Sequence, residues 1–397
     1  MVKYNWFKRG LAALCFAFFA GIGGVSAMES VRIGFDGAYG LKNSTSAQSI
    51  EMGLRLAIDE INTAGGVLGG RPLALVTADN RSVPARGIEN LKKFAADPNL
   101  VAVVGGRFSP VLLQQLELVH HLPIPLLDAW GSADGITDHA QSPSYSFRIS
   151  LRDKYAMPIM LQYAASKGSD KVALLVPNTG WGRSNTNAAE RYIKKHPETQ
   201  ITLIHWYNWG EKDFSAAYQA VLDSGAQALV MVANDLEGSI IVRHVSSRPQ
   251  AERLPIISHW GVTGGAFVEA CGPALQAVDF SVVQTFSMLR SQGPALTRVV
   301  TLLHDKLGIK DPAKMDSPVG FAHAYDLVHI LARAINLAGS IDRVAVRDAL
   351  EQVRDYAGLV RNYDHPFPAE DHNGLKLEDV FMARFQGNTI VPITSAH

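Results

Sequence analysis

The stretch that decides the fold is VAVVGGRFSPVLLQQLELVHHLPIPLLDAWGS, residues 101–132. A short β-branched run is interrupted by a Gly-Gly pair, and Ser109 and Pro110 then form the N-cap and first-turn pair of a helix, with apolar residues following at helical spacing. The pattern predicts a strand, a loop, a helix that starts at Ser109, a second strand and a second loop. Because a helix N-terminus after a parallel strand presents free N–H groups, we expect an anionic group to bind there.

The same alternation of apolar runs and amphipathic segments continues on both sides of this stretch. The predicted strands are Val31–Tyr39, Leu73–Asp79, Leu122–Asp128, Lys171–Pro177, Ala228–Asn234 and Leu254–Trp260; the predicted helices include Ile50–Ile61, Pro84–Ala96, Met157–Lys167, Pro294–Leu307, Val319–Leu337 and Val344–Val353. Strands that alternate with helices form parallel βαβ units. A second, similar half begins near Met157, so the pattern predicts an α/β fold with two Rossmann-like lobes, each a parallel sheet flanked by helices.

The composition agrees with two globular lobes. A chain of 397 residues exceeds one ordinary hydrophobic core, and its 47% hydrophobic and 19% charged residues are typical of a folded protein. The 37 Lys and Arg residues balance 37 Asp and Glu residues. This balance does not favour nucleic acid as a partner.

The N-terminus has the composition of a secretory signal peptide over residues 1–27. A basic head precedes a short apolar stretch, and small residues up to Ala27 form a cleavage site. We therefore expect a periplasmic protein with no membrane insertion after cleavage, since no later segment reaches the roughly 20 apolar residues of a span. Leu14 precedes Cys15, which favours release over lipid anchoring, and cleavage leaves Cys271 without an intramolecular partner.

Four segments carry a resemblance to a known family. They are IEMGLRLAIDEINTAGGVLGGRPL (50–73), VVGGRFSPVLLQ (103–114), GEKDFSAAYQAVLDSGAQALVMV (210–232) and FAHAYDLVHILARAI (321–335). Together they resemble the type I periplasmic solute-binding proteins of the leucine/isoleucine/valine-binding group, over nearly all of the chain after the signal peptide. The resemblance implies two lobes joined by three hinge crossovers, near Arg148, Phe286 and Leu359. It places residues 28–148 and 287–358 in lobe 1 and residues 149–286 and 359–397 in lobe 2.

The resemblance also implies where a ligand would bind. Ser109 matches the serine that holds a ligand carboxylate in the family, although its hydroxyl could instead only cap its own helix. Trp130 and Ser132 take the places of the next loop's contacts, and Trp181 takes the place of an aromatic wall in the second lobe. Both tryptophans could also be ordinary packing or loop aromatics.

Two positions depart from the amino-acid-binding pattern. Asn234 and Asp235 stand where relatives tend to have an aromatic residue, and Trp260 stands where they pair an α-ammonium group with glutamate. A buried ammonium without a counter-charge costs several kcal/mol. Either Asp235 replaces that glutamate, or the ligand is not an α-amino acid and the tryptophans suit an aromatic or flat apolar molecule. Arg107 could then bind a ligand carboxylate, or it could be a solvated surface arginine.

No sequence motif indicates catalysis, a metal or a cofactor. The histidines lack the spacing of metal ligands, and P-loop, G-x-S-x-G and H-E-x-x-H motifs are absent. We expect an exported receptor of an ABC importer that captures an amino acid or a related small carboxylate and delivers it to a membrane permease. The alternative is a periplasmic ligand-sensing subunit that signals to a membrane receptor kinase.

Overall fold

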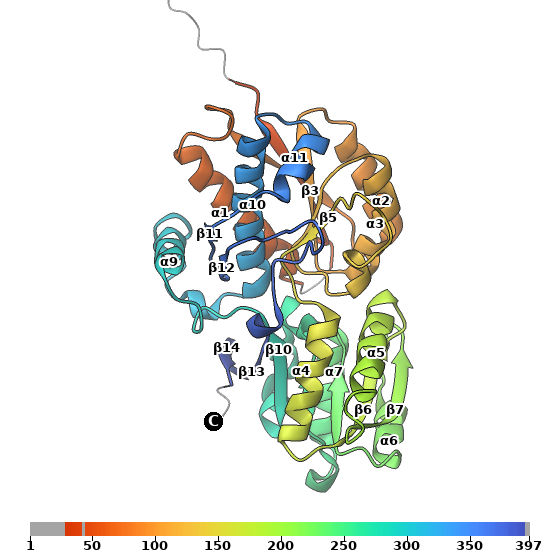
Figure 1. Cartoon of the computed structure of the whole chain (residues 1–397). Helices are drawn as coiled ribbons and strands as arrows, with labels where there is room; N and C mark the ends of the chain where they lie inside the picture. Colours follow the sequence, from red (N-terminus) through yellow and green to blue (C-terminus); the bar gives the residue numbers. More distant parts are fainter. Residues whose placement is uncertain (1–27, 42–43, 394–397) are drawn as a thin grey trace, which may run out of the picture.

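The structure is a computed structural model that describes residues 28–41 and 44–393 (Figure 1). Two lobes, each built around its own β-sheet, are stacked along the long axis of the molecule. The predicted signal peptide lies outside the described residues. Within the described ranges, no helix combines the length and the apolar character needed to cross a membrane.

The first lobe is built on a parallel sheet in the order β2-β1-β3-β4-β5. Its strands are β1 Val31–Gly37, β2 Leu73–Asp79, β3 Leu100–Gly105, β4 Leu126–Asp128 and β5 Ser146–Arg148, and the connecting helices are α1 Ser46–Thr63, α2 Pro84–Ala95 and α3 Ser109–His121. The central strand β3 is buried along its whole length. This explains its continuous apolar run, because helices cover both faces of such a sheet.

The second lobe is built on a mixed sheet in the order β14-β13-β10-β9-β8-β6-β7. Its strands are β6 Lys171–Pro177, β7 Gln200–Tyr207, β8 Ala228–Met231, β9 Ile256–Ser258, β10 Phe280–Gln284, β13 Phe381–Gln386 and β14 Thr389–Pro392; its helices are α4 Asp153–Ser166, α5 Gly180–Ile193, α6 Ser215–Asp223, α7 Asp235–Ser247 and α8 Phe267–Cys271. β6 to β10 are parallel, whereas the C-terminal hairpin of β13 and β14 adds antiparallel strands.

Three helices from the second half of the chain return to the first lobe. They are α9 Pro294–Leu307, α10 Pro318–Ala338 and α11 Arg343–Leu350 (Figure 1). α10 packs along α1 so closely that a Cβ atom at Gly53 would lie 2.2 Å from the backbone oxygen of Phe321. Of its 21 residues, 16 are buried, so α10 is a core element of this lobe.

A short hairpin of β11 (Tyr356–Ala357) and β12 (Asn362–Tyr363) is held on α10 by one buried carboxylate. Asp326 accepts hydrogen bonds from the hydroxyls of Tyr356 (2.9 Å) and Tyr363 (3.0 Å) and from two backbone N–H groups between them, at 2.7 and 2.9 Å. Four donors around one carboxylate fix the position of the hairpin.

The predicted α/β fold with two Rossmann-like lobes is confirmed, and the helix predicted over Pro294–Leu307 matches α9. The strand predicted over Leu122–Asp128 is too long. β4 contains only its last three residues, because Pro123 and Pro125 have no N–H group to donate to a neighbouring strand. β10 has no counterpart among the predictions, since Ser281 and Gln284 interrupt its apolar run.

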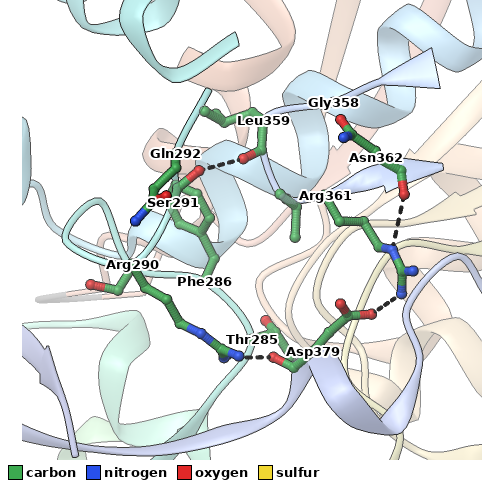
Figure 2. A pocket seen from close by; sticks show the side chains of 12 residues that line it. Thr285, Phe286, Arg290, Ser291, Gln292, Gly358, Leu359, Arg361, Asn362 and Asp379 are labelled. Atoms are coloured by element: carbon green, nitrogen blue, oxygen red, sulfur yellow. Dashed lines mark hydrogen bonds and ion pairs between the residues drawn. The ribbon is translucent and has the colours of Figure 1, made fainter. Parts of the chain in front are cut away.

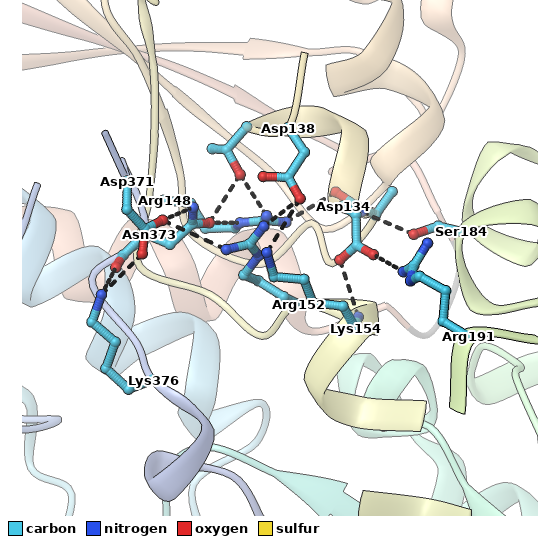
Figure 3. A network of polar contacts seen from close by, with 12 residues as sticks. Asp134, Asp138, Arg148, Arg152, Lys154, Ser184, Arg191, Asp371, Asn373 and Lys376 are labelled. Carbon is cyan, nitrogen blue, oxygen red and sulfur yellow. Dashed lines mark hydrogen bonds and ion pairs between the residues drawn. The ribbon is translucent and has the colours of Figure 1, made fainter. Parts of the chain in front are cut away.

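The chain passes between the two lobes three times, after β5, after β10 and between β12 and β13. The first and third connections run side by side. The Arg148 backbone pairs with Asn373, and its guanidinium Nε donates to the Asn373 side chain at 2.8 Å (Figure 3). The lobe boundaries near Arg148, Phe286 and Leu359 stay predictions; Leu359 itself lies in the hairpin that Asp326 holds.

Candidate functional site

A small cavity lies between the lobes, where the carboxyl ends of parallel strands meet, and the side chains around it leave a volume of only about 10 Å³. Seven of the eight predicted site residues line it. They are Arg107, Ser109, Trp130 and Ser132 from the first lobe and Trp181, Asn234 and Trp260 from the second. The eighth, Asp235, contacts the cavity residue Arg107 directly. The sequence therefore predicted which residues come together, while their role in binding stays a proposal.

Ser109 connects the two ligand loops of the first lobe. It is the first residue of α3, after the N-cap residue Phe108, and its side chain does not cap the helix. Its buried Oγ instead accepts hydrogen bonds from the backbone N–H groups of Ser132 (3.1 Å) and Ala133 (3.2 Å). The prediction that Ser109 is the N-cap is therefore wrong. Both amides use its acceptor capacity, which leaves the hydroxyl hydrogen to donate.

Asp128 at the end of β4 fixes the loop that carries Trp130. Its Oδ1 accepts hydrogen bonds from the backbone N–H groups of Trp130 (3.0 Å) and Gly131 (2.6 Å). Burial raises the pKa of Asp128 to about 7, and the nearby guanidinium of Arg148 opposes this shift. A buried carboxylate thus sets the backbone direction of the loop and with it the position of the indole.

The tryptophans form the walls of the cavity. The rings of Trp130 and Trp260 come from opposite lobes and lie 5.7 Å apart at 53°, while Trp181 meets His259 edge-on at 5.0 Å. The indole nitrogens of Trp130, Trp181 and Trp209 are buried and have no hydrogen-bond partner among the described residues. These walls combine flat apolar faces with N–H donors that could bind a ligand acceptor.

Two buried histidines hold the surrounding segments. His259 Nδ1 accepts a hydrogen bond from the backbone N–H of Trp260 (2.9 Å), so its Nε2 carries the hydrogen that Asp153 accepts at 3.0 Å. On α10, His323 Nδ1 lies 2.9 Å from the backbone oxygen of Ala129, and its Nε2 lies 3.0 Å from Thr285 Oγ1. Burial lowers the pKa of His323 to about 4, so this histidine is neutral.

Arg107 and Asp235 form an ion pair across the two lobes. Arg107 follows β3, Asp235 is the first residue of α7, and Nη2 of the arginine donates to Oδ1 of the aspartate at 2.6 Å. Their side chains are only 4% and 12% exposed. The alternative that Arg107 is a solvated surface arginine is therefore wrong.

The free polar groups at the cavity are mainly hydrogen-bond donors. Arg107 Nε and Nη1 are buried without a partner among the described residues, as are three indole N–H groups. No carboxylate side chain is among the described residues that line the cavity, and the nearby Asp235 is already paired with Arg107. Such a site complements an anion or another acceptor, whereas a cation would find no free counter-charge.

Four residues line the cavity without having been predicted as site residues, namely Phe108, Pro110, Trp209 and Gly261. Trp209 follows β7 just as Trp181 follows β6, so the rule that placed Trp181 would also have placed Trp209. The rings of Phe108 and Trp209 meet across the lobes at 5.7 Å and 73°. Gly261 leaves no such signal; a Cβ atom there would lie 2.7 Å from the Trp181 ring.

The lobes are held together outside the cavity by a polar network near the first and third connections (Figure 3). Asp134 of the first lobe pairs with Arg191 of α5 at 2.9 Å, and its backbone N–H donates to Ser184 at 2.9 Å. Arg152, which is almost fully buried, pairs with Asp138 and lies 3.5 Å from Asp371. These contacts join segments that are far apart in sequence and fix how the lobes meet.

A second cavity lies where the connection after β10 meets the hairpin (Figure 2). Its polar groups are largely paired with one another. Ser291 donates to the backbone oxygen of Leu359 at 2.8 Å, Arg361 pairs with Asp379, and Arg290 donates to the backbone oxygen of Asp379 at 3.3 Å. This cavity therefore lies between two segments that connect the lobes, and it is a poorer candidate for a ligand site than the cavity lined by the tryptophans.

The described residues show no metal site, since no group of three or more His, Cys, Asp or Glu side chains is placed to hold a metal ion. Cys271 is a buried free cysteine.

Comparisons with known proteins agree with this architecture. Residues 30–388 match the family of periplasmic binding proteins. A relative, Leu/Ile/Val-binding protein homolog 1 of Brucella suis biovar 1 (strain 1330), is 26% identical over 337 residues, which are 83% of this chain and 84% of that protein. This chain belongs to the periplasmic binding protein family, whose members are binding proteins rather than enzymes.

Two solved structures share the fold. The branched-chain amino acid transporter substrate binding protein of Streptococcus pneumoniae, in complex with isoleucine, has a TM-score of 0.77 at 21% identity and covers 92% of this chain and 99% of its own. A solute binding protein of an ABC transporter from R. palustris, in complex with benzoate, also has a TM-score of 0.77, at 15% identity, and covers 92% and 95%. The predicted fold class, two lobes of the type I periplasmic binding proteins, is thus confirmed.

Proposed function

We propose that this protein is an exported receptor that captures a small organic carboxylate with a flat or branched apolar body in the cavity between the lobes. The observation that carries the proposal is the set of buried donors without partners, on Arg107 and on the indoles of Trp130, Trp181 and Trp209. A carboxylate would accept hydrogen bonds from these groups, and the indole faces would contact its apolar body. The benzoate bound by the R. palustris protein supports an aromatic acid as one such ligand.

The size of the cavity limits the ligand. The cavity volume of about 10 Å³ lies far below the range of about 300 to 1,000 Å³ that is typical of sites for drug-sized ligands, so a ligand would enter only if the lobes or the tryptophan side chains moved apart. Because so little space separates the walls, we infer that the ligand is small, of the size of benzoate or of a deaminated branched-chain amino acid. Because residues of both lobes line the cavity, a ligand there would contact both and favour the closed arrangement.

Export and delivery to an ABC permease complete the proposal. The basic and apolar segments of residues 1–27 support export, and the relatives among transporter substrate-binding proteins support a permease as the partner. Deleting the gene should abolish cellular uptake of the labelled ligand. Unchanged uptake together with loss of a ligand-dependent kinase response would instead favour the sensing alternative.

The proposal is tested by calorimetry and thermal unfolding of the protein without residues 1–27. We expect benzoate, 3-phenylpropanoate or 4-methylpentanoate to bind with 1:1 stoichiometry, and a ligand at 100 times its Kd to stabilise the fold by about 2.7 kcal/mol. Trp181→Ala should weaken binding by at least about 1 kcal/mol. The matched control is Trp206→Ala, because Trp206 is 40% exposed and outside the cavity. Failure of all small carboxylates to bind would refute the proposal.

A further inference from the structure

We propose that Arg107 determines the class of ligand, because its guanidinium occupies the place beside Asp235 that the ammonium group of an α-amino acid would take. Arg107 would thus act as a built-in substitute for that ammonium. This inference rests on the proposed function and adds to it the residue that separates carboxylates without an ammonium group from amino acids.

The guanidinium of Arg107 lies between the cavity and Asp235. Arg107 lines the cavity, and its Nη2 lies 2.6 Å from Asp235 Oδ1, which is the distance of a charged hydrogen bond between an ammonium and a carboxylate. The guanidinium thus stands between the cavity and the carboxylate. An incoming ammonium group would meet a fixed cation and would find no free carboxylate on the described walls of the cavity.

The guanidinium is also held in place by its neighbours. A Cβ atom at Gly264 would lie 1.9 Å from Arg107 Nη1, so the backbone of Gly264 packs directly on the guanidinium. On another side, the Arg107 guanidinium carbon lies 4.7 Å from the centre of the Phe108 ring. A side chain that is buried, paired and packed in this way does not move aside for a ligand without loss of these contacts.

Removing the guanidinium should reverse the preference. In Arg107→Ala the Asp235 carboxylate, of which only 12% is exposed in the wild-type structure, would remain beside the space that the guanidinium leaves and would lack its cation. An α-amino acid would restore the charge balance by placing its ammonium group in the space that the guanidinium leaves. A carboxylate without an ammonium group would instead meet an unpaired negative charge and lose the free N–H donors of Arg107.

The test compares two matched ligand pairs, 3-phenylpropanoate with phenylalanine and 4-methylpentanoate with leucine, by calorimetry. The wild-type protein should prefer the member without the ammonium group by at least about 30-fold, since an unpaired buried charge costs this much or more. Arg107→Ala should prefer the amino acid. Arg107→Lys keeps a cation and should keep the wild-type preference. The double variant R107A/D235N should lose the affinity for the amino acid that Arg107→Ala gains.

Arg107→Ser serves as a second variant if the alanine variant does not fold, which thermal unfolding reports. A folded Arg107→Ala or Arg107→Ser protein that keeps the wild-type order of affinities would overturn the inference, as would wild-type protein that binds phenylalanine or leucine as tightly as its partner acid. If wild-type protein binds neither acid, the proposed function fails, and the inference is then decided by whether the Arg107 variants gain the amino acids.

Discussion

Ser109→Ala tests both the structural role of this serine and its proposed role in binding. The substitution removes the Oγ atom that accepts hydrogen bonds from the N–H groups of Ser132 and Ala133 at 3.1 and 3.2 Å. Both amides would remain in a buried part of the fold. A buried donor that loses its partner costs about 1 to 3 kcal/mol, so we expect the free energy of unfolding to fall by about 2 kcal/mol or more.

The same substitution should also weaken ligand binding. The hydroxyl hydrogen of Ser109 would be lost as a donor to the ligand carboxylate, and the loop after β4 would lose the two hydrogen bonds that Ser109 accepts from it. A hydrogen bond to a charged group contributes about 1.5 to 3 kcal/mol, so the Kd should rise by about tenfold or more. Urea unfolding measures the first effect, and calorimetric titration with 3-phenylpropanoate measures the second.

Ser132→Ala is the matched control. Ser132 also lines the cavity, but its hydroxyl makes no hydrogen bond within the part of the chain that the structure describes. We expect its free energy of unfolding to stay within about 0.5 kcal/mol of wild type. Equal stability of the Ser109→Ala and Ser132→Ala proteins would refute the assignment of Ser109 as the acceptor that joins the two loops.

Three further predictions concern the elements around the cavity. Gly264→Ala would place its Cβ atom 1.9 Å from Arg107 Nη1 and should raise the ligand Kd at least about tenfold in a calorimetric titration. In the control Gly135→Ala the nearest atom to the new Cβ is 3.4 Å away, so this variant should bind like wild type. Asp326→Asn replaces a carboxylate that accepts four hydrogen bonds by an amide group that accepts fewer, so the free energy of unfolding in urea should fall by about 3 kcal/mol. An unchanged urea midpoint would contradict the role of Asp326 in holding the hairpin. His323 has a pKa of about 4 in the fold, below its ordinary value, so the unfolded chain binds the proton first and the free energy of unfolding should fall as the pH drops from about 6.5 to 4. Urea unfolding at several pH values measures this loss, which should be smaller for His323→Gln. An equal pH dependence of the two proteins would contradict the prediction.

The fold could be predicted because its information is local. The glycine pair after residues 101–104 and the helical spacing after Ser109 each depend on neighbours along the chain. The cavity residues could be predicted for a related reason. In parallel sheets the carboxyl ends of the strands meet at one edge, so Trp130, Trp181 and Asn234 converge although they are far apart in sequence.

The partners within the site could not be predicted in the same way. Arg107 and Asp235 are 128 residues apart, and they come together only because residues of the two lobes meet at the cavity. The acceptor role of Ser109 likewise depends on where the loop after β4 folds, 23 residues later. Sequence patterns locate such side chains at an edge, but they do not show which of them pair.

The tryptophan walls have a practical consequence. Of the six tryptophans in the sequence, Trp130, Trp181, Trp209 and Trp260 line the cavity, and a fifth, Trp6, belongs to the segment that we predict is removed. The intrinsic ultraviolet emission of the protein without residues 1–27 should therefore originate mostly from the proposed binding site. Unlabelled protein could then serve as an optical sensor with which fractions of a cell extract are screened for the natural ligand.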